Sequence, residues 1–173
     1  MRRTRLADML RGGDRRSIGK ANQIAKLVLS EPTRVPELFK CLWDENPVVR
    51  MRAADAAEKI TVTRPELWNP HKKELLGLLE EAEQIELRWH MALMVPRLEL
   101  NASERQRAAA TLQRYLEDRS SIVKTFALQG LADLAQQDAR LREPARRALE
   151  EGLRTGTAAM KARARKLLKE LQN

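Results

Sequence analysis

Pairs of leucines four residues apart recur along the chain and are its strongest regular pattern. From the second pair onward the copies are 37 residues apart, and the first copy lies 32 residues before the second. A constant period of about 20 to 50 residues is typical of a solenoid, in which each unit buries its apolar face against its neighbours. The pairs are Leu6/Leu10, Leu38/Leu42, Leu75/Leu79, Leu112/Leu116 and Leu149/Leu153.

A second apolar stripe follows each leucine pair after a short polar turn. In the second copy it contains Val49, Ala53 and Ile60, which share one face of a helix. Asn46 and Pro47 precede this stripe and suit the N-cap and the first helical residue. Each unit is therefore predicted to be a helix–turn–helix pair, and its buried positions return in the later copies, as Val49 does in Leu87, Val123 and Met160, and Ala53 in Met91, Ala127 and Ala164.

These patterns predict a single all-α domain of five helix pairs, at residues 3–30, 33–63, 65–100, 101–139 and 141–173. Pro96 falls inside the helix expected from about residue 84 to 100, and it should kink that helix or end it early. Gly12-Gly13-Asp14 is expected to form the turn of the first pair. Other helix starts are expected at Asn69-Pro70, at Ser103 with Gln106 as a capping box, at Ser120 or Ser121, and at Thr157.

The composition agrees with a folded, helix-rich protein. Apolar residues make up 43% of the chain, charged residues 33% and aromatic residues 3%. Cys41 is the only cysteine, so no internal disulfide is expected. No apolar run approaches the ~20 residues that cross a bilayer, and the basic start lacks the apolar segment of a signal peptide. We therefore expect a cytoplasmic protein without membrane insertion.

The net charge is +9 and is unevenly distributed. Residues 1–30 carry eight basic and two acidic side chains, and residues 141–173 carry nine and four, whereas residues 65–100 carry four and seven. Such a distribution favours anionic partners near the termini but does not identify nucleic acid. The N-terminal cluster comprises Arg2, Arg3, Arg5, Arg11, Arg15 and Arg16.

The stretch from residue 38 to 54 resembles a HEAT repeat. It has the paired leucines of that family, then Asp44 and Pro47, then Val49-Arg50 and the two alanines Ala53 and Ala54. The copy that contains Asp118, Val123, Lys124 and Ala127 matches the same pattern more loosely. The resemblance implies a right-handed α-α superhelix (solenoid) whose second helices line the concave face. It implies no chemistry, because such repeats serve many unrelated roles.

Four cations occupy the same position of the second helix, and we call them the basic ladder: Arg50, Arg88, Lys124 and Lys161. One interpretation is a row of charges on the inner face, suited to a phosphate backbone or an acidic protein segment. The alternative is a structural role, in which each cation pairs with an acid in the preceding turn. Asp44 lies six residues before Arg50, and Asp118 six before Lys124. The HEAT resemblance implies such Asp–Arg pairing between neighbouring repeats.

Several aromatic residues break the period. Phe39 and Trp43 occupy mostly polar positions of the later copies, so they either form an exposed anchor or pack against the first repeat or a loop. Trp89 and His90 follow Arg88 directly. With Arg50 and Arg52 one repeat earlier, they are predicted to form an aromatic and cationic patch, which is our preferred partner-binding site.

No catalytic or metal-binding pattern stands out. The sequence contains no glycine-rich phosphate loop and no nucleophile elbow, and His71, His90 and Cys41 do not have the spacing of a zinc site. We therefore expect no cofactor, no metal and no small-molecule substrate.

The predicted function is a non-catalytic scaffold or adaptor that binds a protein partner, such as an acidic segment, through its concave face. The alternative is a nucleic-acid-binding module that uses the basic ladder and the basic termini. Some alkylpurine DNA glycosylases are built of HEAT-like repeats and place Trp, Asp and Arg along a groove. Trp43, Asp44, Arg50 and Trp89 are residues of the same types, so a glycosylase-like enzyme is a third hypothesis.

Overall fold

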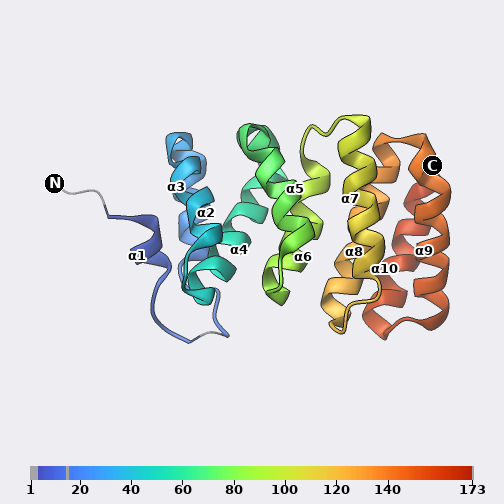
Figure 1. The fold of residues 1–173 in the computed structure, drawn as a ribbon. Helices are drawn as coiled ribbons and strands as arrows, with labels where there is room; N and C mark the ends of the chain where they lie inside the picture. The colour runs from blue at the N-terminus through green and yellow to red at the C-terminus, as the bar shows by residue number, and fades with distance from the viewer. Residues whose placement is uncertain (1–3, 15, 173) are drawn as a thin grey trace. The chain divides into compact units, whose positions relative to one another are not determined.

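The computed structural model describes residues 4–14 and 16–172, which form ten α-helices joined by turns and short 3-10 helices (Figure 1). Arg2, Arg3 and Arg15 of the N-terminal cluster lie outside the described residues. The helices follow one another as five pairs: α1 (Leu6–Leu10) and α2 (Ala21–Ser30), α3 (Val35–Lys40) and α4 (Pro47–Thr63), α5 (Lys72–Glu81) and α6 (Ile85–Met94), α7 (Ala102–Tyr115) and α8 (Ser121–Gln137), α9 (Arg142–Thr155) and α10 (Ala158–Leu171).

The contacts divide the chain into two compact units. Unit 1 spans Met1–Lys72 and unit 2 spans Lys73–Asn173. Both units are helical in the part of the chain that the structure describes, as the leucine period predicts. None of the described helices combines the length and the apolar character needed to cross a bilayer.

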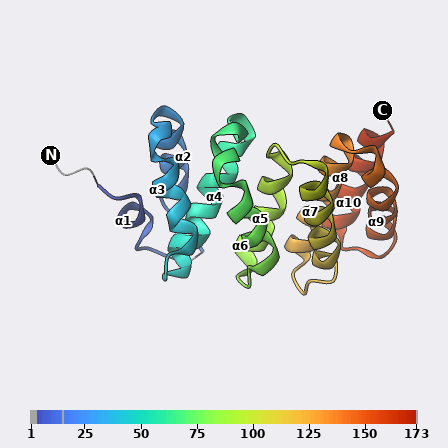
Figure 2. The ribbon, with the colours of Figure 1, turned by 45° about the horizontal axis from the view of Figure 1, so that its top comes forward.

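Unit 1 is built around α4. Helix α2 packs along α4, and the short α1 contacts both α3 and α4 (Figure 2). The 3-10 helices η1 (Pro32–Arg34), η2 (Cys41–Trp43) and η3 (Pro65–His71) connect the longer elements. The leucine pairs Leu6/Leu10 and Leu38/Leu42 are completely buried here, together with Ala53 and Ile60 of α4. These leucines therefore form the core of unit 1, as the sequence predicts.

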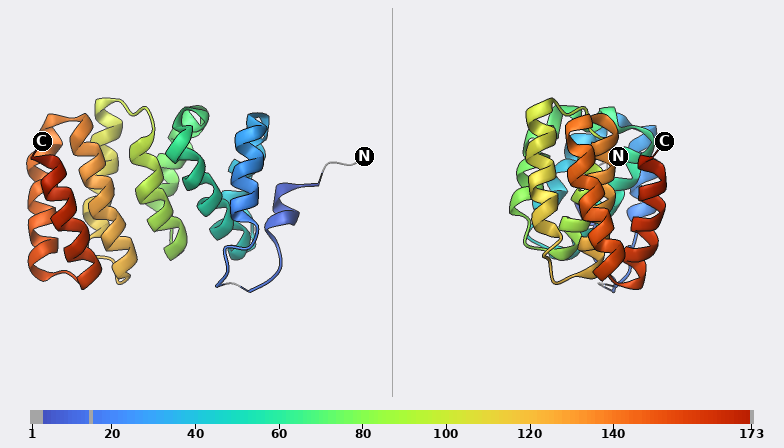
Figure 3. Two further views of the ribbon diagram at one scale, coloured as in Figure 1. Left: turned by 180° about the vertical axis from the view of Figure 1, so that it is seen from behind. Right: turned by 90° about the vertical axis from the view of Figure 1, so that its right-hand side faces the viewer.

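Unit 2 has two layers of helices. The first helices of the pairs, α5, α7 and α9, form one layer, and the second helices, α6, α8 and α10, form the other (Figure 3). Helix α8 lies between α6 and α10 and contacts both. Gly130 permits the close approach of α6 to α8, because a Cβ at this position would lie 2.5 Å from the carbonyl oxygen of Ala92.

Most of the helix starts agree with the sequence. The Asn46 side chain caps α4 by accepting a hydrogen bond from the Val48 amide at 2.9 Å. Ser120 caps α8 and Thr157 caps α10. Gly12 and Gly13 form the expected turn with φ values of 77° and 76°.

Two predicted helix starts are wrong. The capping box of α7 belongs to Asn101 and Glu104 and not to Ser103 with Gln106. Helix α7 begins at Ala102, so Asn101 is its N-cap, and the Asn101 carboxamide oxygen accepts a hydrogen bond from the Glu104 amide at 2.9 Å. Asn69-Pro70 lies within η3, and the regular helix α5 begins only at Lys72.

Pro96 ends its helix early, which is one of the two outcomes predicted. Helix α6 stops at Met94, and the 3-10 helix η4 (Val95–Arg97) follows. Proline lacks the amide hydrogen that would continue the ladder of the α-helix, and its ring clashes with the preceding turn.

The later leucine pairs are less buried than predicted. Leu75, Leu79, Leu112 and Leu149 are completely buried, but Leu116 and Leu153 are half-buried. Leu116 lines a hollow of about 740 Å³ between the fourth and fifth pairs. Helix packing leaves this space unfilled, so Leu116 contacts solvent.

Candidate binding surface on the second helices

The first two members of the basic ladder are engaged by the turns that precede them. Arg50 donates hydrogen bonds from Nη1 to the carbonyl oxygens of Asp44 and Glu45, at 2.8 and 3.1 Å. Arg88 donates from Nε to the carbonyl oxygen of Ala82 at 2.8 Å. In both repeats one acceptor lies six residues before the arginine. These contacts cap carbonyl groups at the end of the first helix of the pair.

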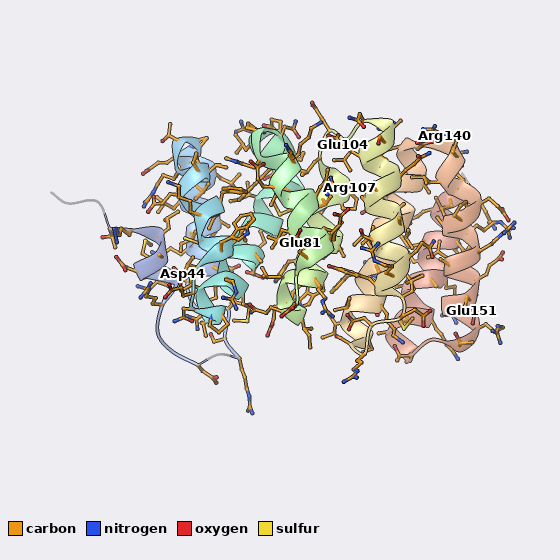
Figure 4. The ribbon with its side chains drawn as sticks, viewed as in Figure 1. Asp44, Glu81, Glu104, Arg107, Arg140 and Glu151 are labelled. Carbon is orange, nitrogen blue, oxygen red and sulfur yellow. The ribbon has the colours of Figure 1, made fainter. Side chains whose placement is uncertain are left out.

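Asp44 and Asp118 connect neighbouring repeats. Asp118 accepts a hydrogen bond from Arg88 Nη1 at 2.5 Å, and Asp44, labelled in Figure 4, lies 3.5 Å from Arg11 Nη2. In each aspartate the other carboxylate oxygen accepts a backbone hydrogen bond two residues ahead, from Asn46 or Ser120. Asp118 thus pairs with Arg88 of the previous repeat and not with Lys124, although it lies six residues before Lys124, the spacing that suggested such a pair.

The last two members of the ladder differ from the first two. Within residues 4–14 and 16–172, neither the Lys124 nor the Lys161 side chain makes a hydrogen bond or ion pair. Both are half-buried, and Lys124 lines the hollow between the fourth and fifth pairs. The ladder therefore consists of two structurally engaged arginines and two unpaired lysines.

Arg52 lies in the interior of unit 1 and is 2% exposed. Its guanidinium donates to four carbonyl oxygens, that of Leu10 at the end of α1 and those of Gly12, Asp14 and Ser17 in the segment that leads to α2, at 2.5 to 3.1 Å. A partner cannot reach a side chain in this position, so Arg52 does not belong to an accessible binding patch. His90 is also 2% exposed, and its ring lies beside that of Trp89.

Phe39 contacts both Trp43 and His71, and the contact with His71 was not predicted from the sequence. The Phe39 ring stacks on His71 with centroids 4.1 Å apart, and its centroid lies 4.7 Å from that of Trp43. Phe39 is thereby half-buried, while Trp43 remains 47% exposed. No group of three or more His, Cys, Asp or Glu side chains among the described residues could hold a metal ion.

An aromatic and cationic row crosses the second helices of unit 2. Trp89 of α6 stacks against Phe126 of α8, with centroids 5.4 Å apart. Arg163 of α10 lies over the Phe126 ring, with its Cζ 5.5 Å from the ring centroid. All three side chains are half-buried. We call Trp89, Phe126 and Arg163 the Trp–Phe–Arg row.

Only Trp89 of this row was singled out from the sequence. Phe126 and Arg163 each immediately precede one of the alanines that repeat in the second helices, Ala127 and Ala164. Phe126 and Arg163 therefore occupy the same position of successive second helices, so the repeat predicts that they are neighbours. The repeat thus indicates which residues are neighbours, but it does not distinguish an exposed position from a buried one.

A chain of polar contacts holds the guanidinium of Arg163 in place. Arg163 donates from Nη1 to Gln129 Oε1 at 2.7 Å, and Gln129 donates from Nε2 to Asp133 Oδ1 at 2.8 Å. Burial raises the pKa of Asp133 above its usual value, although the Gln129 hydrogen bond and the charges of Arg97 and Arg163 act in the opposite direction. Arg163 is therefore oriented before any partner binds.

A shallow hollow lies beside the row, and we call it the α8–α10 groove. Its volume is about 480 Å³. Ile122, which is 51% exposed, contributes apolar surface from α8. Its lining includes Ile122 and Phe126 of α8 and Ala159, Ala162, Arg163 and Lys166 of α10, together with the hydroxyl side chains of Ser121 and Thr125. It combines an apolar floor with cationic side chains.

Two solved structures with a similar fold are those of an engineered protein and of a designed armadillo repeat protein. The crystal structure of an engineered protein, a Northeast Structural Genomics Consortium target, aligns with a TM-score of 0.68 at 17% identity, covering 96% of this chain and 78% of that one. The designed armadillo repeat protein YIII(Dq.V1)4CPAF, in complex with the peptide (KR)4, aligns with a TM-score of 0.68 at 20% identity, covering 97% and 80%. No protein-family model matches the sequence, and no curated protein shows significant similarity to it. The fold is that of a helical repeat solenoid.

Proposed function

We propose that this protein is a non-catalytic, HEAT-like repeat scaffold that binds an acidic segment of a protein partner on the second helices of unit 2. The observation that carries the proposal is the Trp–Phe–Arg row, which presents one partly exposed side chain from each of three successive second helices. Aromatic residues and arginine are enriched at protein interfaces, where they supply much of the binding energy. Repeat proteins use such extended surfaces to bind partners.

The charge of α10 favours an acidic partner. Its residues 158–171 include five basic side chains and one acidic one, Glu170. The designed armadillo repeat protein supports peptide binding by this fold, but its peptide, (KR)4, is basic. A basic peptide would meet like charges along α10, so we expect the present chain to select the opposite sign.

The contacts between repeats support the HEAT-like assignment. Arg88 pairs with Asp118 of the next repeat, and Arg11 lies near Asp44 of the next repeat. The HEAT resemblance implies this kind of Asp–Arg pair. The glycosylase hypothesis gains no similar support, because the Asp44 carboxylate accepts a backbone hydrogen bond within its own turn.

A display library of random peptides tests the proposal. We expect the purified protein to enrich acidic peptides and the Arg163→Glu variant to lose that enrichment, because its reversed charge repels carboxylates. Arg146→Glu on the exposed face of α9 is the control, since it makes the same change of charge away from the row. Equal enrichment by the wild type and the Arg163→Glu variant would contradict the proposed surface.

Nucleic-acid binding is the second candidate, and the unpaired Lys124 and Lys161 favour it. Binding to mixed-sequence duplex DNA should then weaken steeply with salt, with log K falling by ~0.9 for each contacted phosphate per unit of log salt. Lys161→Glu should reduce both the affinity and this salt dependence. Absence of duplex binding at low salt would eliminate this candidate and the glycosylase hypothesis together.

A further inference from the structure

We infer that the α8–α10 groove is an anchor site for one apolar side chain flanked by carboxylates in the bound segment. This inference rests on the proposed function and specifies the part of the partner that is recognised. The groove is a place where exposed apolar surface and cations meet in unit 2. The occupant we propose is an acidic peptide segment with a central leucine or phenylalanine.

Small side chains on α10 create the groove. Ala159 and Ala162 line its α10 side, and they face the larger Ile122 and Phe126 of α8. At the equivalent positions of α6 the chain has Glu86 and Trp89. The two alanines therefore leave space between α8 and α10 that a tryptophan would fill.

The groove has room for an apolar side chain, and its floor is apolar. Its volume of about 480 Å³ lies within the range of about 300 to 1,000 Å³ that is usual for ligand sites. Ile122 is 51% exposed, although it is a large aliphatic residue. An apolar side chain that entered the groove would remove this surface from water, which is favourable.

Two cations provide the charge complementarity. Arg163 is oriented by Gln129 and by the Phe126 ring. A guanidinium held in this way can still donate to a carboxylate with its remaining N–H groups. Lys166 lies one turn further along α10, with Glu170 3.7 Å away. The cations would contact carboxylates beside the apolar residue of the segment, whereas a basic segment would be repelled.

Fluorescence anisotropy with four labelled probes tests the inference. The probes are an acidic peptide with a central phenylalanine, the same peptide with alanine in its place, the (KR)4 peptide, and a mixed-sequence DNA duplex. We expect the phenylalanine peptide to bind about tenfold tighter than the alanine peptide, or more, because it buries an apolar side chain. The (KR)4 peptide should bind weakest.

Matched variants locate the effect. Ala162→Trp fills the groove and should remove the preference for phenylalanine while leaving weak binding of both acidic peptides. Ala110→Trp makes the same change at an exposed position of α7 and should preserve the preference. Arg163→Gln should lower the affinity for both acidic peptides by the same factor. Circular dichroism of each variant shows that it remains helical.

Three outcomes would overturn the inference. Equal affinity for the two acidic peptides, with binding intact, contradicts the anchor site but leaves the proposed function standing. A phenylalanine preference that survives in Ala162→Trp shows that the anchor binds elsewhere. Preferential binding of (KR)4 or duplex DNA, or no binding of any probe, contradicts both the anchor and the acidic partner.

Discussion

Arg52 in unit 1 and Arg163 in unit 2 occupy the same position of the repeat, yet they have different surroundings. Each precedes a completely buried alanine of the second helix, Ala53 or Ala164. The guanidinium of Arg52 is enclosed by the segment between α1 and α2, whereas that of Arg163 lies partly exposed beside Phe126 and Gln129. The position in the repeat determines which face of the helix carries the side chain, but the neighbouring segment determines whether the side chain is structural or accessible.

The segment that covers Arg52 is shaped to fit it. A Cβ at Gly19 would lie 2.7 Å from the Cζ atom of Arg52, and the φ of Gly19 is 52°. Only glycine combines this conformation with such a close approach. Unit 1 thus uses its arginine to hold a chain segment, while unit 2 leaves the equivalent arginine to interact with a partner.

The largest effect is expected from Arg52→Met. The four carbonyl oxygens would lose their donor, and the free energy of unfolding should fall by about 3 kcal/mol. Arg163→Met removes the same charge from a partly exposed side chain and should cost less than about 1 kcal/mol. Urea denaturation measures both values. Similar losses in the two variants would contradict the distinction between a structural and an accessible arginine.

A further change tests the helix spacing that brings Trp89 to Phe126. Gly130→Ala would place a Cβ against the main-chain oxygen of Ala92, so we expect a loss of about 1 to 3 kcal/mol. The control is Gly77→Ala in α5, where nothing lies within 4 Å of the added Cβ, and it should stabilise by up to about 1 kcal/mol. Urea denaturation followed by tryptophan fluorescence distinguishes the two results. A neutral Gly130→Ala would show that α6 and α8 can separate at no cost.

The two Asp–Arg pairs compare the units on a smaller scale. Arg88 and Asp118 in unit 2 are 2.5 Å apart with the carboxylate side chain 7% exposed, whereas Arg11 and Asp44 in unit 1 are 3.5 Å apart and more exposed. Arg88→Gln should therefore destabilise by about 1 to 2 kcal/mol, and Arg11→Gln by less than about 0.5 kcal/mol. Thermal unfolding of both variants provides the measurement, and a reversed order would refute this ranking.

The smallest expected effect is a loss of stability at alkaline pH, caused by the buried Cys41 and Tyr115. Burial raises the pKa of Cys41 in unit 1 from 9.0 to about 11, and burial raises that of Tyr115 in unit 2 from 10.0 to about 12. The unfolded chain releases each proton first, so stability should fall as the pH rises from about 9 to 11 for Cys41 and from about 10 to 12 for Tyr115. Cys41→Ala should remove the earlier phase and Tyr115→Phe the later one in urea denaturation at increasing pH. An unchanged pH profile in Cys41→Ala would contradict this assignment.

Local sequence was sufficient for the helix pairs and for most of their ends. The leucine period places the helices because side chains 3 and 4 residues apart share a helix face. Asn46, Ser120 and Thr157 cap helices through their own side chains, and Pro96 ends α6 for a similarly local reason. The sequence did not identify Asn101 as the N-cap of α7, because both Asn101 and Ser103 can cap a helix. Which of them does so depends on where the helix begins in the folded protein.

The candidate binding surface depended on contacts between segments that are far apart in the sequence. The period places Arg52, His90, Phe126 and Arg163 in one column, but it does not show that the first two are buried and the last two partly exposed. Likewise, the α8–α10 groove exists because Ala159 and Ala162 of α10 face larger side chains of α8, which lie one repeat earlier in the sequence. Sequence by itself determined the repeat and the direction of each side chain, because both follow from local helix geometry. The tertiary structure alone decided which of those side chains reach solvent, because that depends on the segment packed against them.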